Sequence, residues 1–218
     1  MIRTQTSFLV AAIASLGFAA SAHAQQGAAQ VTQFKGSNAG TFIVFGPTAI
    51  CADGSVGTVN GFGFISASDS TSHQPGGPPT SGSGAFIEIL DYFDSCTGTF
   101  IGFGLAGLSG GYQGPNPALK SASLSGSTFV QDLDTGASFP MNLNLVFTGQ
   151  GPVTAEKGTT VTHDAGSFKV IVFRQSSASR AAGVTGTITI NGVEPDASFS
   201  STSLATNSTG TVTVQQQN

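Results

Sequence analysis

Residues 141–148 read Met-Asn-Leu-Asn-Leu-Val-Phe-Thr, and this stretch decides the fold class. Its odd-numbered positions are apolar, and asparagine or threonine fills most of the even-numbered ones. Successive side chains of an extended chain point to opposite faces, so this period of two predicts a strand with one face on a core and one in water. The same alternation, with threonine as the polar partner, recurs at 187–190 and 211–214.

Turn residues separate these segments in the manner of an antiparallel sheet. The segments 94–98, Asp134–Gly136 and Asn191–Gly192 each lie between apolar runs and predict hairpins, with Asn-Gly the strongest of the three signals. No segment after the first 24 residues has sustained helical periodicity. We therefore expect an all-β protein, an antiparallel β-sandwich of Greek-key or jelly-roll type.

Three segments are apolar on both faces, at 41–45, 85–93 and 168–173. Such runs are typical of central strands, or of strands covered by a second layer or by a partner. The 15 phenylalanines that follow residue 24 are expected to lie in the core.

The N-terminus is typical of a cleavable secretory signal. Arg3 precedes an apolar run from Phe8 to Ala20, and Ala22-His23-Ala24 supplies small residues at the positions that a signal peptidase reads. We expect residues 1–24 to be removed and residues 25–218 to form one domain in the periplasm or outside the cell, in a bacterial setting.

Export bears on Cys51 and Cys96, the two cysteines of the chain. An even number of cysteines in an oxidising compartment favours pairing, whereas a zinc site needs more ligands and a redox pair is usually Cys-x-x-Cys. The sequence predicts one structural disulfide between them.

Charge is scarce. Charged residues make up 8% of the sequence, and residues 25–218 contain 6 basic and 11 acidic residues, a net charge of −5. No basic patch is available to neutralise phosphates, which argues against a nucleic-acid partner. Solubility must come from serine, threonine, asparagine, glutamine and glycine on the exposed strand faces.

The Ser/Gly/Pro-rich stretch 66–84 is the candidate ligand loop, and we single out Ser66, His73 and Gly84 within it. Three prolines there remove backbone donors, so a long and flexible surface loop is expected at about 66–84.

The remaining motifs carry little chemistry. Gly107–Gly111 matches the Gly-x-Ser-x-Gly nucleophile pattern, but the residues after it cannot begin the helix that the pattern needs. His73 and His163 have no neighbours in sequence that would orient them for catalysis. The acidic pairs Asp132/Asp134 and Glu194/Asp196 suit turns better than a calcium loop, although calcium stays open.

We therefore name no catalytic, cofactor or metal residue, and we expect a non-enzymatic structural or adhesive module at the cell surface. A module that binds a polysaccharide or another small ligand is the first alternative. A secreted hydrolase, with a site assembled from distant residues, is the second.

Overall fold

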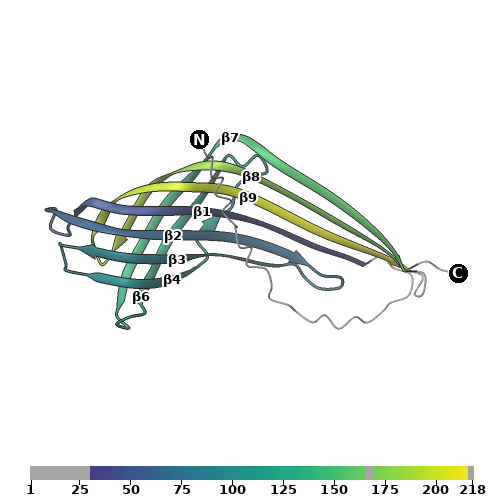
Figure 1. The fold of residues 1–218 in the computed structure, drawn as a ribbon. Helices are drawn as coiled ribbons and strands as arrows, with labels where there is room; N and C mark the ends of the chain where they lie inside the picture. Colours follow the sequence, from purple (N-terminus) through teal and green to yellow (C-terminus); the bar gives the residue numbers. More distant parts are fainter. Residues whose placement is uncertain (1–29, 165–168, 216–218) are drawn as a thin grey trace, which may run out of the picture.

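The computed structural model describes residues 30–164 and 169–215, and all of their regular structure is β-strand (Figure 1). The predicted leader at 1–24 lies outside the described residues. No helix in the described ranges is long and apolar enough to cross a membrane. The nine strands are β1 (Gln30–Ile50), β2 (Val56–His73), β3 (Thr80–Asp94), β4 (Phe100–Ser109), β5 (Tyr112–Gln113), β6 (Ser121–Asp132), β7 (Ser138–Asp164), β8 (Lys169–Ile190) and β9 (Glu194–Gln215).

The strands form one antiparallel sheet in the order β4-β3-β2-β1-β9-β8-β7-β6-β5. The sheet closes on itself because β4 also pairs with β6, through Gly104 with Asp132 and Leu105 with Gln131. The all-β and antiparallel prediction is confirmed. The predicted sandwich of Greek-key or jelly-roll type is not confirmed, because the apolar faces pack against one another inside a single ring-like sheet. An alternating pattern specifies a buried face, but it does not specify whether a second sheet or the same sheet covers that face.

The core fills the inside of this ring. The inward positions of 141–148 are between 0 and 3% exposed, as the alternation predicts. Isoleucines dominate the rest of the interior, and the completely buried side chains include Ile43, Ile65, Ile87, Ile89, Ile101, Leu124, Ile188 and Ile190.

Tight curvature of the sheet depends on glycine at two close approaches. Gly61 has a φ of 147°, and a Cβ there would lie 2.7 Å from the Cα of Tyr92 on β3. Gly186 has a φ of 132°, and a Cβ there would collide with the backbone carbonyl of Asn144 on β7. Neither position accepts a side chain, so neighbouring strands can bend closely past each other.

The predicted hairpins are confirmed. Turns at 95–99, 133–137 and 191–193 join β3 to β4, β6 to β7 and β8 to β9. The Cys51–Cys96 disulfide is also present, with a Cα–Cα distance of 5.4 Å. It links the turn after β1 to the turn after β3.

The expected long loop at 66–84 is wrong in extent. Ser66 and His73 belong to β2 and Gly84 belongs to β3, and these strands pair from Ser72–Thr80 onward. Only residues 74–79 form the connection. The prolines, at 75, 78 and 79, all fall in that connection, so they leave the ladder intact on either side.

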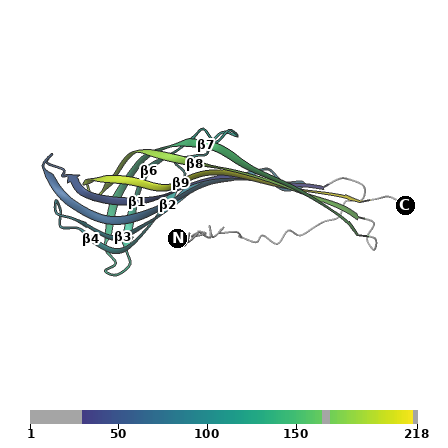
Figure 2. The ribbon, with the colours of Figure 1, turned by 45° about the horizontal axis from the view of Figure 1, so that its top comes forward.

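Four strands continue beyond the ring as a long projection, which we call the arm (Figures 1 and 2). The arm comprises residues 30–38 of β1, 205–215 of β9, 169–182 of β8 and 150–164 of β7. Figure 2 shows it as a single thin layer. The hairpin of β2 and β3 runs beside the inner part of the arm, from the pair Asn38–Ser68 to the pair Gln33–His73.

The centre of the sheet joins the two ends of the described chain. β1 pairs with β2 on one side and with β9 on the other, from Gln30–Thr213 to Ile50–Glu194. The arm and the ring therefore share one continuous ladder.

Candidate functional site

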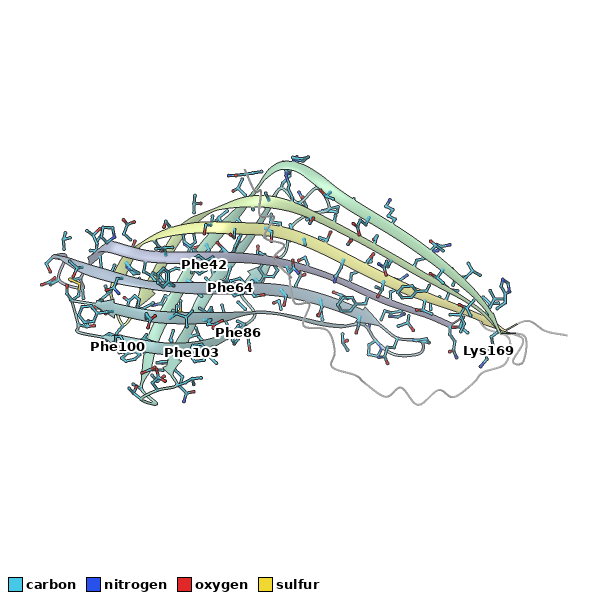
Figure 3. All side chains as sticks on the ribbon, in the orientation of Figure 1. Phe42, Phe64, Phe86, Phe100, Phe103 and Lys169 are labelled. Carbon is cyan, nitrogen blue, oxygen red and sulfur yellow. A yellow bond between two sulfur atoms is a disulfide. The ribbon has the colours of Figure 1, made fainter. Side chains whose placement is uncertain are left out.

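The outer surface of β1 to β4 carries a broad apolar patch, which we call the aromatic face (Figure 3). Its members come from four adjacent strands, and cross-strand pairing brings them together: Phe42 is opposite Phe64, and Leu90 is opposite Phe103. The aromatic face comprises Phe42, Val44, Phe62, Phe64, Phe86, Leu90, Phe93, Phe100, Phe103 and Leu105.

Half of these side chains are exposed to solvent, and the other half are half-buried. Phe62, Phe64, Phe86 and Phe100 are 44%, 41%, 47% and 57% exposed. Phe62 also stacks on Phe42, with ring centroids 6.0 Å apart. Two carboxylates interrupt the patch: Glu88 lies between Phe64 and Leu105 in the strand register, and the exposed Asp91 lies between Leu90 and Phe93 on β3. A contiguous apolar surface of this kind is typical of an interaction site.

The expectation that the phenylalanines lie in the core is therefore wrong for most of them. Among the described phenylalanines, Phe45 and Phe147 are buried, and Phe139 and Phe199 pack at the edge of the core. The segments 41–45 and 85–93 are apolar on both faces because one face lines the ring and the other forms the aromatic face. The apolar residues on both faces of these two segments were therefore the sequence signal for the aromatic face.

The opposite side of the ring is polar. Outward positions of β7 and β8 hold mostly asparagine and threonine, with the exposed Val146 among them, and side-chain hydrogen bonds link neighbouring strands. The Ser127 hydroxyl donates to Asn142 Oδ1 at 2.6 Å, and Asn142 Nδ2 donates to Thr189 Oγ1 at 3.1 Å. The outer surface of the ring thus has an apolar side and a hydrated side.

A shallow groove of about 530 Å³ lies at the base of the arm. It is lined mainly by hydroxyl and amide side chains, together with Phe34 and Glu156. Ser68, Asp69 and Ser70 line one wall. Part of the predicted ligand segment therefore borders the groove, whereas Ser66, His73 and Gly84 do not line it.

A small polar cluster closes the ring on the arm side. The Ser37 backbone N–H and hydroxyl both donate to Asp69 Oδ1, at 2.8 and 2.5 Å. The buried hydroxyl of Tyr112, on β5, lies against this pair without a hydrogen-bond partner among the described residues. Burial raises the pKa of Tyr112 to about 12, with the Ser37 hydroxyl opposing the rise and the Asp69 carboxylate adding to it.

The structure does not bring the two histidines together. His73 is on β2 and His163 is on β7, with β1, β9 and β8 between them. Four strand spacings separate them by roughly 20 Å. Ser109, in the Gly107–Gly111 motif, ends β4, and the short strand β5 follows it rather than a helix.

The end of the ring opposite the arm, which we call the turn end, is strongly acidic. It comprises residues 50–57, 91–100, 131–138 and 190–197, and these segments contain no lysine or arginine. Their seven acidic residues are Asp53, Asp91, Asp94, Asp132, Asp134, Glu194 and Asp196. No group of three or more histidine, cysteine, aspartate or glutamate side chains in the described ranges is arranged to hold a metal ion.

Two of these carboxylates organise turns. Asp94 accepts hydrogen bonds from the backbone and hydroxyl of Thr97, at 2.7 and 3.0 Å. Asp132 is buried and accepts the Thr135 hydroxyl at 2.5 Å. That hydrogen bond lowers the pKa of Asp132 below 3.8, and burial opposes the shift.

Asp132→Ala is expected to lower the free energy of unfolding by about 1–3 kcal/mol, because it leaves the turn donors without their acceptor. The lowered pKa means that this contribution is present above pH 3.8 and is lost as the pH falls further. Urea denaturation at pH 7 and pH 3 should therefore show a difference from wild type that shrinks at pH 3. Asp134→Ala is the control, since the Asp134 side chain is exposed; an equal loss in both variants would contradict the assignment.

Comparisons of the chain with protein-family models, with curated proteins and with solved structures gave no match. Function must therefore be argued from the surfaces described above.

Proposed function

We propose that this protein is an exported, non-enzymatic structural or adhesive module that attaches to apolar surfaces through the aromatic face. The observation that carries the proposal is the exposure of five phenylalanines on the adjacent strands β2, β3 and β4. Keeping such a patch in contact with water is unfavourable, so a surface that covers it gains free energy.

Other features agree with this role. A disulfide and the absence of a membrane-spanning helix in the described ranges are compatible with a secreted protein. The hydrated side of the ring would face solvent while the aromatic face is covered. Attachment by a sheet face needs no moving part and no reactive group.

The test is adsorption of the oxidised protein to whole cells and to alkyl-coated beads. Replacing Phe62, Phe64 and Phe86 together by serine is expected to reduce retention by tenfold or more. Each ring is about half exposed, so covering it contributes roughly 1 kcal/mol.

The matched control replaces Thr148, Thr185 and Thr187 by serine, on the hydrated side of β7 and β8. These positions are exposed, so both triple variants should unfold at temperatures close to that of wild type. Undiminished retention of the phenylalanine variant on both surfaces would exclude the aromatic face as the attachment site.

The groove at the base of the arm supports a second candidate, a polysaccharide-binding module. Its lining of Ser68, Ser70, Asn207 and Glu156 offers donors and acceptors suited to sugar hydroxyls, and Phe34 offers an apolar surface. Asn207→Ala with Ser177→Ala should then weaken sedimentation with an insoluble polysaccharide and leave adsorption to alkyl beads unchanged. Equal binding of variant and wild type to every polysaccharide would remove this candidate.

A further inference from the structure

Among the described residues, no second layer covers either face of the arm, and its β7 edge is free (Figure 2). No strand pairs with the outer edge of β7 over 151–164 among the described residues, which leaves about 45 Å of backbone groups open. Val153, Val161 and Val214 are 42%, 51% and 40% exposed. A long, flat edge flanked by exposed valines is a site for association with another chain.

The strand register places apolar and basic side chains on one face of the arm. Val31, Val212, Val172 and Val161 lie opposite one another in a single row across β1, β9, β8 and β7. The next row on the same face lies two residues further along each strand, and Arg174 of β8 belongs to it.

Lys35 and Lys157 belong to the same face, because the following row runs from Lys35 through Ser208 and Ser176 to Lys157. We call this surface the valine–lysine face. Lys169 adds a further cation at the far tip of the arm (Figure 3).

Charge is therefore separated along the molecule. The arm segments contain five basic and two acidic residues, a formal charge of 5 − 2 = +3. The turn end contains seven acidic residues and no basic ones, a formal charge of −7. The two regions lie at opposite ends of the ring and arm, as Figure 1 shows.

The turn end also exposes apolar side chains beside its carboxylates. Ile50 is 56% exposed and pairs with both Val56, which is 75% exposed, and Glu194. Leu133, next to Asp134, is 49% exposed. Each end of the molecule thus offers exposed apolar side chains with charges of opposite sign to the other end.

We propose that copies of this protein associate head to tail, with the valine–lysine face of one copy docked on the turn end of the next. Opposite charges steer and align the contact, and the valines cover Ile50, Val56 and Leu133. The contact is heterologous and its two halves lie at opposite ends of an elongated molecule, so it propagates as an open chain rather than closing as a dimer. This inference is independent of the aromatic face.

The test uses two charge-reversed variants of the oxidised protein. The arm variant carries Lys35→Glu, Lys157→Glu and Arg174→Glu. The turn-end variant carries Asp134→Lys, Glu194→Lys and Asp196→Lys, at exposed positions whose carboxylates accept no hydrogen bond among the described residues. Asp94 and Asp132 are left in place because they hold turns.

Analytical ultracentrifugation at low salt is expected to show concentration-dependent assembly of wild type that weakens as salt rises from roughly 0.05 to 0.5 M. Each variant alone should assemble about 100-fold more weakly, because it places like charges at the contact. A mixture of the two should recover assembly to within about tenfold of wild type, since each arm then meets a complementary turn end.

A wild-type protein that stays monomeric at low salt overturns the proposal, as does a mixture that fails to recover assembly. The proposal is also overturned if wild type does not self-associate but binds anionic lipid vesicles through the arm. The cations of the arm would then belong to a membrane-binding surface. The variant with Phe62, Phe64 and Phe86 replaced by serine tests adsorption through the aromatic face separately. It should self-associate as strongly as wild type.

Discussion

Replacing Cys51 and Cys96 together by serine is expected to lower the free energy of unfolding by about 4 kcal/mol. The disulfide closes a loop across a sequence separation of 45, which restricts the unfolded chain strongly. It also joins two turns at the acidic end of the ring, where like charges repel one another. Both effects favour the oxidised folded state.

Urea denaturation of the double-serine variant against the oxidised wild type measures this difference. A reducing agent is the control: it should destabilise the wild type by a similar amount and leave the variant unchanged. A loss below about 1 kcal/mol would mean that the ladders of β1 and β3 already hold these turns without the bond.

Alkaline conditions are expected to unfold the protein through its two tyrosines. Burial and the nearby Asp94 carboxylate raise the pKa of Tyr92, and burial raises that of Tyr112 to about 12. Both hydroxyls are buried without a hydrogen-bond partner among the described residues. The folded state therefore holds both protons at a pH where the unfolded chain, with a pKa near 10, releases them.

The tyrosine contribution to the stability of the native protein should accordingly be constant from pH 7 to pH 10 and fall between pH 10 and 12, by about 1.4 kcal/mol per pH unit for each tyrosine. The combined slope is close to 3 kcal/mol per pH unit. The chain contains two tyrosines and no tryptophan, so tyrosinate absorbance follows these two groups alone.

The variant Tyr92→Phe with Tyr112→Phe should keep its stability through this range, and at pH 7 it should be at least as stable as wild type, because each substitution removes an unpaired buried hydroxyl. Tyrosinate formation near pH 10 in the folded wild type would contradict the buried placement of the hydroxyls.

Much of the fold could be predicted because it rests on local chemistry. The alternation at 141–148, the Asn191–Gly192 turn and the cysteine pair each act over a few residues or through a simple count. Closure of the sheet could not be predicted in this way. It depends on a short ladder between β4 and β6 and on glycines such as Gly186, whose role appears only when the facing carbonyl is known.

The candidate surfaces were only partly predictable. The two-faced apolar segments indicated that something must cover them, and the exposed Phe62 and Phe86 are not covered by the described part of the chain. The valine–lysine face was hidden, because Val31 and Val161 become neighbours only through the register of four strands. Long-range register is not visible in the spacing of one segment.

The pairing of β1 with β9 has a consequence for the order of events during synthesis. The first described strand finds one of its two partners at once in β2, but its other edge waits for residues 194–213, which are synthesised much later. The sheet therefore cannot be completed until β9 has been synthesised. Contacts of such long sequence separation form slowly, so β1 keeps one edge unpaired, and open to pairing with other chains, until β9 arrives.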